Sequence, residues 1–333
     1  ETHFSLIVEG VQHDLQVLEF KGREAISQPF AFDLELVSER PDLDLESLLH
    51  QRAFLTLSPG GKGIHGLIYS AAQGNSGKRL TRYRVTLRPQ LAYLSHRTNQ
   101  RIFQQLSVPQ IIAKVLDEHG ILAGDRHRFD LGPVLYPKRD YCVQYDETDL
   151  QFIQRLCEEE GIHYHFQHSE TGHMLVFGDD QTSFAKLGQP TAYLQDNGMT
   201  ADEPVIKRFA VRVATRTSRV SRRDYDFEQP RLLMEAAYRG EPAADAMPKP
   251  DLEDYDYPGR FTERARGKHL SQRALESHRH DYRLAEGKSD QPRLVSGHLL
   301  EISDHPRREW HDLWLLTEVL HEGKQPQVLE ESI

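Results

Sequence analysis

The chain has 333 residues, of which 28% are charged and 38% hydrophobic, and its formal net charge is −10 at pH 7. This length suits two or three domains with ample core, and the negative charge argues against nucleic acid as the main partner, because phosphate binding requires a basic surface. No run approaches the ~18 apolar residues of a membrane span, and the N-terminus lacks a signal peptide's pattern. Since only two cysteines occur, no disulfide framework is expected and a reducing site of synthesis is indicated.

The N-terminal third of the chain alternates between apolar and polar residues, as half-buried strands do. The run PFAFDLELV, for example, places Phe30, Phe32 and Leu34 on one face. Glycine-rich turns at 58–63 and 74–78 separate such runs. Many short strands with these breaks predict an antiparallel barrel or sandwich.

Two helices with the same start signal follow. Ser107 and Gln110 are spaced as a capping box, in which the serine caps an early backbone amide and the glutamine reaches back, and Thr148 and Gln151 repeat this spacing. Apolar residues then recur at helical spacing, and a glycine follows each stripe. The strand IHYHF comes after the second helix, so the middle of the chain is predicted to be α+β.

Strand patterns return from about residue 190, and helical spacing predicts one long helix from Thr262 to about Ala285. A Pro-rich, acidic loop at 241–259 lies between them. The basic stretch Arg208–Arg223 is interleaved with valines and threonines, which favours a strand with a solvated face over a phosphate groove.

The pair His163 and His165 is the one weak candidate for a metal site. The two lie two residues apart on a predicted strand, with His168 and His173 nearby, and zinc takes three or four nitrogen, sulfur or oxygen ligands. The nearest carboxylates, 158–160, are better explained as the solvated last turn of a helix. A polar face or a subunit contact is therefore favoured, and no metal or cofactor is expected.

Three adjacent carboxylates, Glu158, Glu159 and Glu160, close the second helix against its macrodipole, so a cation must offset them. Arg155 on the same helix, or a basic residue of a partner subunit, could do so. General acid–base chemistry would need a closed cleft and shifted pKa values. The pattern favours a salt-bridged, structural role at an interface.

The acidic loop is a second candidate contact surface, because long loops in compact domains are usually functional or mobile. Its carboxylates could meet a basic partner, and the alternative of a merely solvated loop stays equally open. The candidates are Asp251, Glu253, Asp254 and Asp256.

Catalytic signatures are missing from the sequence. It contains no G-x-S-x-G elbow, no G-x-x-x-x-G-K-[ST] phosphate loop, no G-x-G-x-x-G and no H-E-x-x-H zinc helix. The residues therefore give no support to an enzyme.

The segment Tyr141–Phe166, YCVQYDETDLQFIQRLCEEEGIHYHF, closely resembles the VgrG family of type VI secretion systems. Further phrases agree in the expected order, among them FAFDLELVSE, YRVTLRPQLAYLSHRTNQRIFQ at 83–104 and YDYPGRF at 255–261. The resemblance covers essentially the whole chain.

The resemblance implies a fold like the baseplate hub of contractile phage tails, which is α+β and mainly β. It implies two antiparallel barrel-like domains, at 1–95 and 186–333, the second carrying a helix at about 262–285, and an α+β domain at 96–185 between them. The oligonucleotide-binding-type domain and β-helical needle of full-length members lie outside this sequence.

The resemblance also implies a role as the structural hub of a trimeric spike, and not as an enzyme. The homotrimer would adapt a hexameric, Hcp-like tube protein to the threefold needle, with baseplate components as further partners. Either the tube protein or a baseplate component could meet the acidic loop. A tip protein and effectors would bind through the region C-terminal to this chain. The protein would be made in the bacterial cytoplasm and injected without a signal peptide.

Two alternatives from other classes stay open. Exposed aromatic residues such as Tyr255, Tyr257, Trp310 and Trp314 would suit a carbohydrate-binding β protein, and the histidines at 163–173 a metal-dependent hydrolase. The observation of a self-associating ring without bound metal would favour the structural hub over both alternatives.

Overall fold

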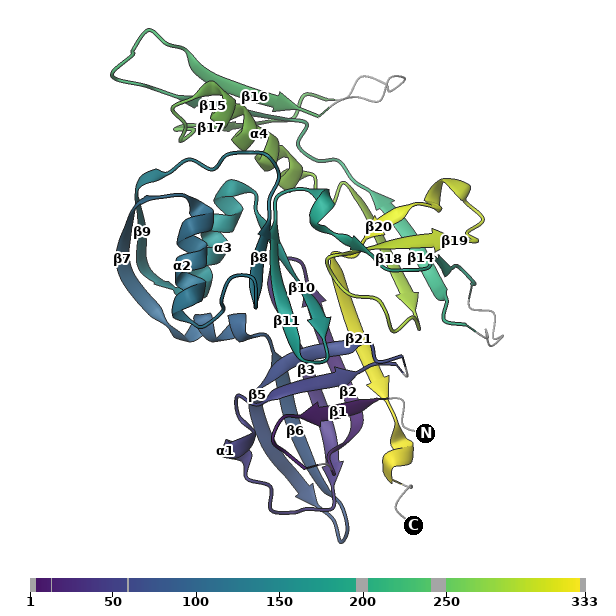
Figure 1. The fold of residues 1–333 in the computed structure, drawn as a ribbon. Helices are drawn as coiled ribbons and strands as arrows, with labels where there is room; N and C mark the ends of the chain where they lie inside the picture. Colours follow the sequence, from purple (N-terminus) through teal and green to yellow (C-terminus); the bar gives the residue numbers. More distant parts are fainter. Residues whose placement is uncertain (1–3, 13, 59, 196–202, 241–249, 330–333) are drawn as a thin grey trace. The chain divides into compact units, whose positions relative to one another are not determined.

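The structure is a computed structural model that describes residues 4–12, 14–58, 60–195, 203–240 and 250–329 (Figure 1). It divides into two compact units. The first unit contains Glu1–Leu156, Ile162–Ile206 and Ser289–Ile333, and the second contains Cys157–Gly161 and Lys207–Lys288. Strands dominate both units, which confirms the α+β, mainly β class (Figure 1).

A seven-stranded antiparallel sheet, in the order β1-β4-β5-β6-β3-β2-β21, forms the first part of unit one. The predicted alternation is confirmed, because Phe30, Phe32 and Leu34 all point into its core. Its strands are β1 (Ser5–Val8), β2 (Gln16–Ala25), β3 (Gln28–Ser38), β4 (Arg52–Thr56), β5 (Gly63–Ser76), β6 (Thr81–Arg88) and β21 (Glu318–Lys324).

The sheet curls until its two ends are joined through the buried side chain of Gln325, directly after β21. The Gln325 amide donates to the carbonyls of Phe4 at 2.8 Å and Val17 at 2.5 Å, and its oxygen accepts from the Phe4 N–H at 3.1 Å. The Phe4 ring also meets the Phe20 ring edge to face, with centroids 5.0 Å apart. One glutamine side chain thus links the start of the chain to β2.

Replacing Gln325 with alanine is expected to lower the free energy of unfolding by about 2 kcal/mol, because three hydrogen bonds to backbone groups are lost, one of them buried and two part-buried. Urea unfolding followed by tryptophan fluorescence would measure the loss. The exposed Gln104, which makes no such link, is the matched control, and its alanine variant should stay within about 0.5 kcal/mol of the parent. Equal stability of the two variants would contradict the linking role.

Both predicted capping boxes are confirmed in the middle of the chain. Ser107 and Gln110 form a reciprocal box at the start of the first helix, and Thr148 and Gln151 exchange bonds of 2.9 and 3.1 Å at the second. The elements here are β7 (Thr98–Leu106), α2 (Val108–Glu118), β8 (His127–Asp130), β9 (Arg139–Thr148), α3 (Asp149–Glu160), β10 (His163–Ser169) and β11 (Gly172–Gly178). The β7–β9 pair forms its own ribbon, and β10, β11 and β8 form a three-stranded sheet.

The rest of unit one is a small sheet built around β19, together with short helices. Its strands are β12 (Ala185–Lys186), β13 (Thr191–Ala192), β19 (His298–Ser303) and β20 (Leu313–Leu315). The short helices are α1 (Leu45–Leu48) and the 3-10 helices η1 (Gln90–His96), η2 (Gln181–Ser183), η3 (Arg308–Trp310) and η4 (Pro326–Leu329). Closure of the C-terminal strands into a second barrel stays a prediction, as do the three domain boundaries.

Unit two packs one helix against a three-stranded sheet. Its elements are β14 (Ile206–Val213), β15 (Arg219–Asp224), β16 (Met234–Arg239), β17 (Glu253–Asp256), α4 (Arg264–His278) and β18 (Arg283–Ser289). Phe261 lies in its core, and Gly267 of α4 is needed there, because a Cβ at this position would come within 2.7 Å of the Phe261 ring. The long helix predicted at 262–285 is therefore present but shorter, since the chain leaves it after His278 and begins a strand at Arg283.

Residues 241–249 of the Pro-rich loop lie outside the described residues. Its remainder contains β17, which pairs parallel with β15. Within the described part of the chain, the longest apolar stretch in any helix is too short to cross a membrane.

Candidate interaction surfaces and buried polar clusters

The acidic triplet at the end of α3 does not share one environment. Glu160 is buried and forms an ion pair with Arg266 of α4, both in the second unit, whereas Glu158 is exposed. Arg155 contacts Glu147 at 2.5 Å. A salt bridge therefore neutralises Glu160, and its cation, Arg266, lies 106 residues further on, where no local spacing could have indicated it.

The described acidic residues of the Pro-rich loop are paired within their own unit. They contact basic side chains of β15, β16 and α4 at 2.9 to 3.1 Å, and these chains are part-exposed, so each pair stabilises the fold by only ~0–1 kcal/mol. The pairs are Arg219 with Asp251 and Glu253, Arg239 with Asp251, Arg222 with Asp256, and His278 with Asp254. Much of the charge offered to a partner is thus neutralised internally.

His163 and His165 both face an aromatic environment on β10. The His163 ring stacks on Phe184 at 4.5 Å, and its Nε2 lies 3.2 Å from the carbonyl of Asp180. His165 is buried, and neither ring nitrogen has a hydrogen-bond partner within the part of the chain that the structure describes. Burial, reinforced by His298 and His163, lowers the pKa of His165 to about 3. Among the described residues, no three His, Cys, Asp or Glu side chains are arranged to hold a metal ion.

The other two histidines of this segment belong to a separate cluster. His168 of β10 lies opposite His173 of β11, and both meet His65 of β5. The Nδ1 atoms of His65 and His173 are 2.9 Å apart, and the His65 backbone N–H donates to His168 Nδ1 at 3.1 Å. Burial lowers the pKa of His65 and of His168 to about 4, and that of His173 well below its ordinary value. Sequence reasoning missed His65, because only the tertiary fold brings β5 to this hairpin.

This histidine cluster lines a cavity of about 500 Å³ in unit one. Arg52, Gln90 and Arg126 contribute further polar walls, and the β10–β11 hairpin closes one side.

A second buried network surrounds Asp149, the first residue of α3, whose side chain has no exposed surface. His119 Nε2 lies 2.7 Å and Gln144 Nε2 2.8 Å from its carboxylate, with Arg97 at 3.3 Å and Arg101 at 3.4 Å. The same arginines donate hydrogen bonds to Glu118. Burial acts to raise the pKa of Glu118, but the two arginines outweigh it and hold that pKa below its ordinary value. The network joins β7, β9, α2 and α3 and has a structural role.

The β7–β9 ribbon presents an apolar outer face to solvent, which we call the ribbon face. It consists of Ile102, Tyr141, Val143 and Tyr145, of which Tyr145 is 75% and Tyr141 69% exposed. Ile102 pairs with Val143 in the register, so these side chains form one continuous strip. The adjacent Cys142 and Phe103 are buried on the inner face. Contiguous exposed apolar side chains of this kind mark an interaction surface.

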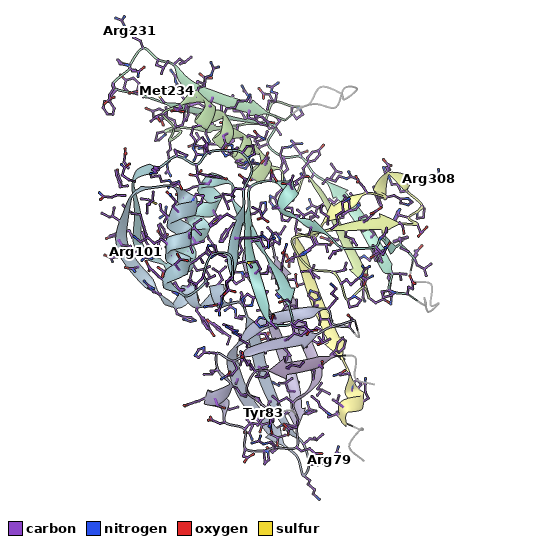
Figure 2. All side chains as sticks on the ribbon, in the orientation of Figure 1. Arg79, Tyr83, Arg101, Arg231, Met234 and Arg308 are labelled. Carbon is purple, nitrogen blue, oxygen red and sulfur yellow. The ribbon has the colours of Figure 1, made fainter. Side chains whose placement is uncertain are left out.

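Unit two carries a second such surface at the tip of its β15–β16 hairpin, where Figure 2 labels Arg231 and Met234. Tyr255 and Tyr257, which the sequence had proposed as sugar-stacking residues, line a hollow of about 450 Å³ with Tyr225. The exposed large hydrophobic residues here are Tyr225, Phe227, Leu232, Leu233, Tyr255 and Tyr257.

Comparison with known families identifies the group to which these features belong. Residues 23–327 match the family described as phage tail baseplate hub (GPD). The chain belongs to this family. The matched region covers more than nine tenths of the present sequence, from within β2 to beyond β21.

Curated relatives of this hub chain include spike proteins. It is 69% identical, over all 333 residues, to the type VI secretion system spike protein VgrG4b of Pseudomonas aeruginosa, and 35% identical over 342 residues to VgrG3 of Vibrio cholerae. The hub chain covers 41% and 33% of those proteins, so it spans about two fifths or less of their length. The resemblance to VgrG inferred from the sequence is confirmed.

Solved structures confirm the fold of the hub chain. A type VI secretion component of E. coli, the c3393 protein, described as similar to the T4 tail proteins gp27 and gp5, aligns with a TM-score of 0.74 and 22% identity, covering 96% of this chain and 73% of that one. The 43 kDa tail protein of prophage MuSo2 from Shewanella oneidensis aligns with a TM-score of 0.65 and 15% identity, covering 97% and 95%. The comparisons lend no support to the hydrolase or carbohydrate-binding alternatives.

Proposed function

We propose that this chain is the structural hub of a type VI secretion spike and has no catalytic role of its own. The observation that carries the proposal is the 69% identity along the entire chain to a spike protein. Two further observations support a role in an assembly: the fold is shared with phage tail components, and the described residues carry two exposed apolar surfaces.

The assembled form proposed is a homotrimer, which places an Hcp-like hexameric tube on one side and a threefold needle on the other. Baseplate components would contact its periphery, and a tip protein and effectors would be carried by the region C-terminal to this chain. It would be synthesised in the bacterial cytoplasm and delivered by the secretion system. The boundaries 1–95, 96–185 and 186–333 remain our proposal for its domains.

Light scattering after size exclusion, across a dilution series, tests assembly. We expect the mass of three chains, because a symmetry adaptor must present threefold interfaces. A monomer at every concentration would contradict trimer formation by these residues.

The exposed Glu158 and the part-exposed Glu159 can be tested in the same series. Changing Glu158 and Glu159 to glutamine leaves the internal Glu160–Arg266 pair intact. If these two carboxylates contact a neighbouring subunit, the variant trimer should begin to dissociate at a higher protein concentration than the parent trimer does. The matched control is a double glutamine change of Glu39 and Glu46, which are also exposed or part-exposed. An unchanged trimer would remove Glu158 and Glu159 from the interface.

A further inference from the structure

The histidine cavity of unit one has a fixed pattern of protons. A backbone N–H can only donate, so His168 Nδ1 and His173 Nε2, which receive the N–H groups of His65 and Gln90 at 3.1 and 3.2 Å, are both unprotonated acceptors. The proton of neutral His173 is therefore on Nδ1, and it is donated to His65 Nδ1 at 2.9 Å. His65 and His168 must then both carry their protons on Nε2.

These tautomers decide which ligands the cavity can accept. The acceptor lone pairs of His65 Nδ1, His168 Nδ1 and His173 Nε2 are already used, so none is left for a metal cation. The Nε2–H groups of His65 and His168 make no hydrogen bond to any residue that the structure describes, and both residues line the cavity. The cluster itself thus offers donors and no acceptors. The Glu24 carboxylate does not line the cavity, although its charge acts to raise the pKa of His168 against the larger effect of burial.

Two arginines add positive charge to the same cavity. Arg52 lies 3.9 Å from Glu9 and Arg126 lies 3.5 Å from Asp125, which are longer than the ~2.7–2.9 Å of a charge-assisted hydrogen bond. Asp125 itself lines the cavity. Both carboxylates are mostly exposed, however, so the two guanidinium groups keep donors for another anion. Gln90 takes one Arg126 donor, at 2.7 Å, and so orients that side chain at the cavity wall.

We propose that this cavity is an oxyanion-binding site, which takes a carboxylate or phosphate group between Arg52, Arg126 and the Nε2–H donors of His65 and His168. The volume of about 500 Å³ lies in the range of ligand pockets. The anion is either a free small molecule or a carboxylate from another protein chain. The donors come from β4, β5, β10 and the loop before β8, so the site depends on the folded unit and not on any one segment.

Isothermal titration with inorganic phosphate, and separately with acetate, at constant ionic strength tests the site. We expect saturable binding, together with shifts of the His65 and His168 ring signals in NMR spectra. Arg126→Gln and Arg52→Gln should each weaken binding by roughly tenfold, the loss of one charge-assisted contact. Arg84→Gln removes the same charge from β6 outside the cavity and should leave the affinity unchanged.

Titration of the assembled protein then separates the two sources of the anion. Phosphate binding retained after assembly identifies a free anion as the occupant, whereas binding present in the dissociated chain and lost on assembly identifies a neighbouring carboxylate. The absence of saturable binding, or equal affinity in the parent and in both cavity arginine variants, would overturn the proposal. Circular dichroism of each variant checks that unit one is still folded.

Discussion

Replacing Asp149 with alanine is expected to destabilise the first unit by about 3 kcal/mol, near the lower end of the cost of breaking a buried ion pair. The carboxylate has no exposed surface, and it receives Arg97, Arg101 and His119 within 3.4 Å. Its removal leaves the two arginines without their anion and the His119 Nε2 without its hydrogen-bond partner. Because both arginines also reach solvent and retain Glu118, the loss falls short of the full penalty for a wholly buried charge.

Urea unfolding monitored by tryptophan fluorescence would measure this loss, since Trp310 and Trp314 both belong to the first unit. Asp117→Ala on α2 is the matched control, because that carboxylate is exposed, and it should change stability by no more than ~0.5 kcal/mol. A double-mutant cycle with Arg101→Met then isolates the pair, for which we expect a coupling of about 1–3 kcal/mol. Additive losses would contradict the network.

The features that depend on neighbours in sequence were predictable. Strand alternation around Phe30 and Phe32 follows from a two-residue period, and the boxes at Ser107 and Thr148 from a three-residue spacing. The end of α4 was not predictable to the residue, because helical apolar spacing continues past His278 while the backbone does not.

The polar clusters could not be predicted, because their members are far apart in the chain. Glu160 meets Arg266 across 106 residues, and His65 meets His173 across 108. Pairing at such separations is set by strand register and packing, which no local pattern encodes. The family resemblance supplied the fold but not these contacts. The residue pattern predicted a salt-bridged role for the acidic triplet at an interface, but it did not reveal that Glu160 is neutralised by Arg266 of the same chain.

Lowering the pH from 7 to 4 is expected to remove a large part of the stability of unit one, on the order of 5 kcal/mol. Burial lowers the pKa of His65 and His168 to about 4 and that of His165 to about 3, whereas the unfolded chain has the ordinary value near 6.5. Between these values the unfolded state binds more protons, so stability that is complete above pH 6.5 is lost as the pH falls toward 4. We allow roughly 1.5–2 kcal/mol for each of the three histidines, less than the full linkage energy, because the folded chain can relax and admit water around a protonated ring.

His165 gives the sharpest test of this loss, because its ring nitrogens have no hydrogen-bond partner among the described residues and its replacement removes a titration without removing a bond. We expect His165→Phe to keep the stability of the parent at pH 7, where the ring lies against Phe184 at 5.3 Å, and to lose less stability as the pH falls. The slope of unfolding free energy against pH is proportional to the number of protons taken up on unfolding. Between pH 6 and 4 that number should be smaller by about one in His165→Phe than in the parent. His280→Phe, at an exposed position of unit two, is the matched control and should leave the slope of the first unit unchanged. If His165→Phe keeps the parent's slope, the acid sensitivity of unit one comes from other groups, and the buried ring of His165 is not one of its sources.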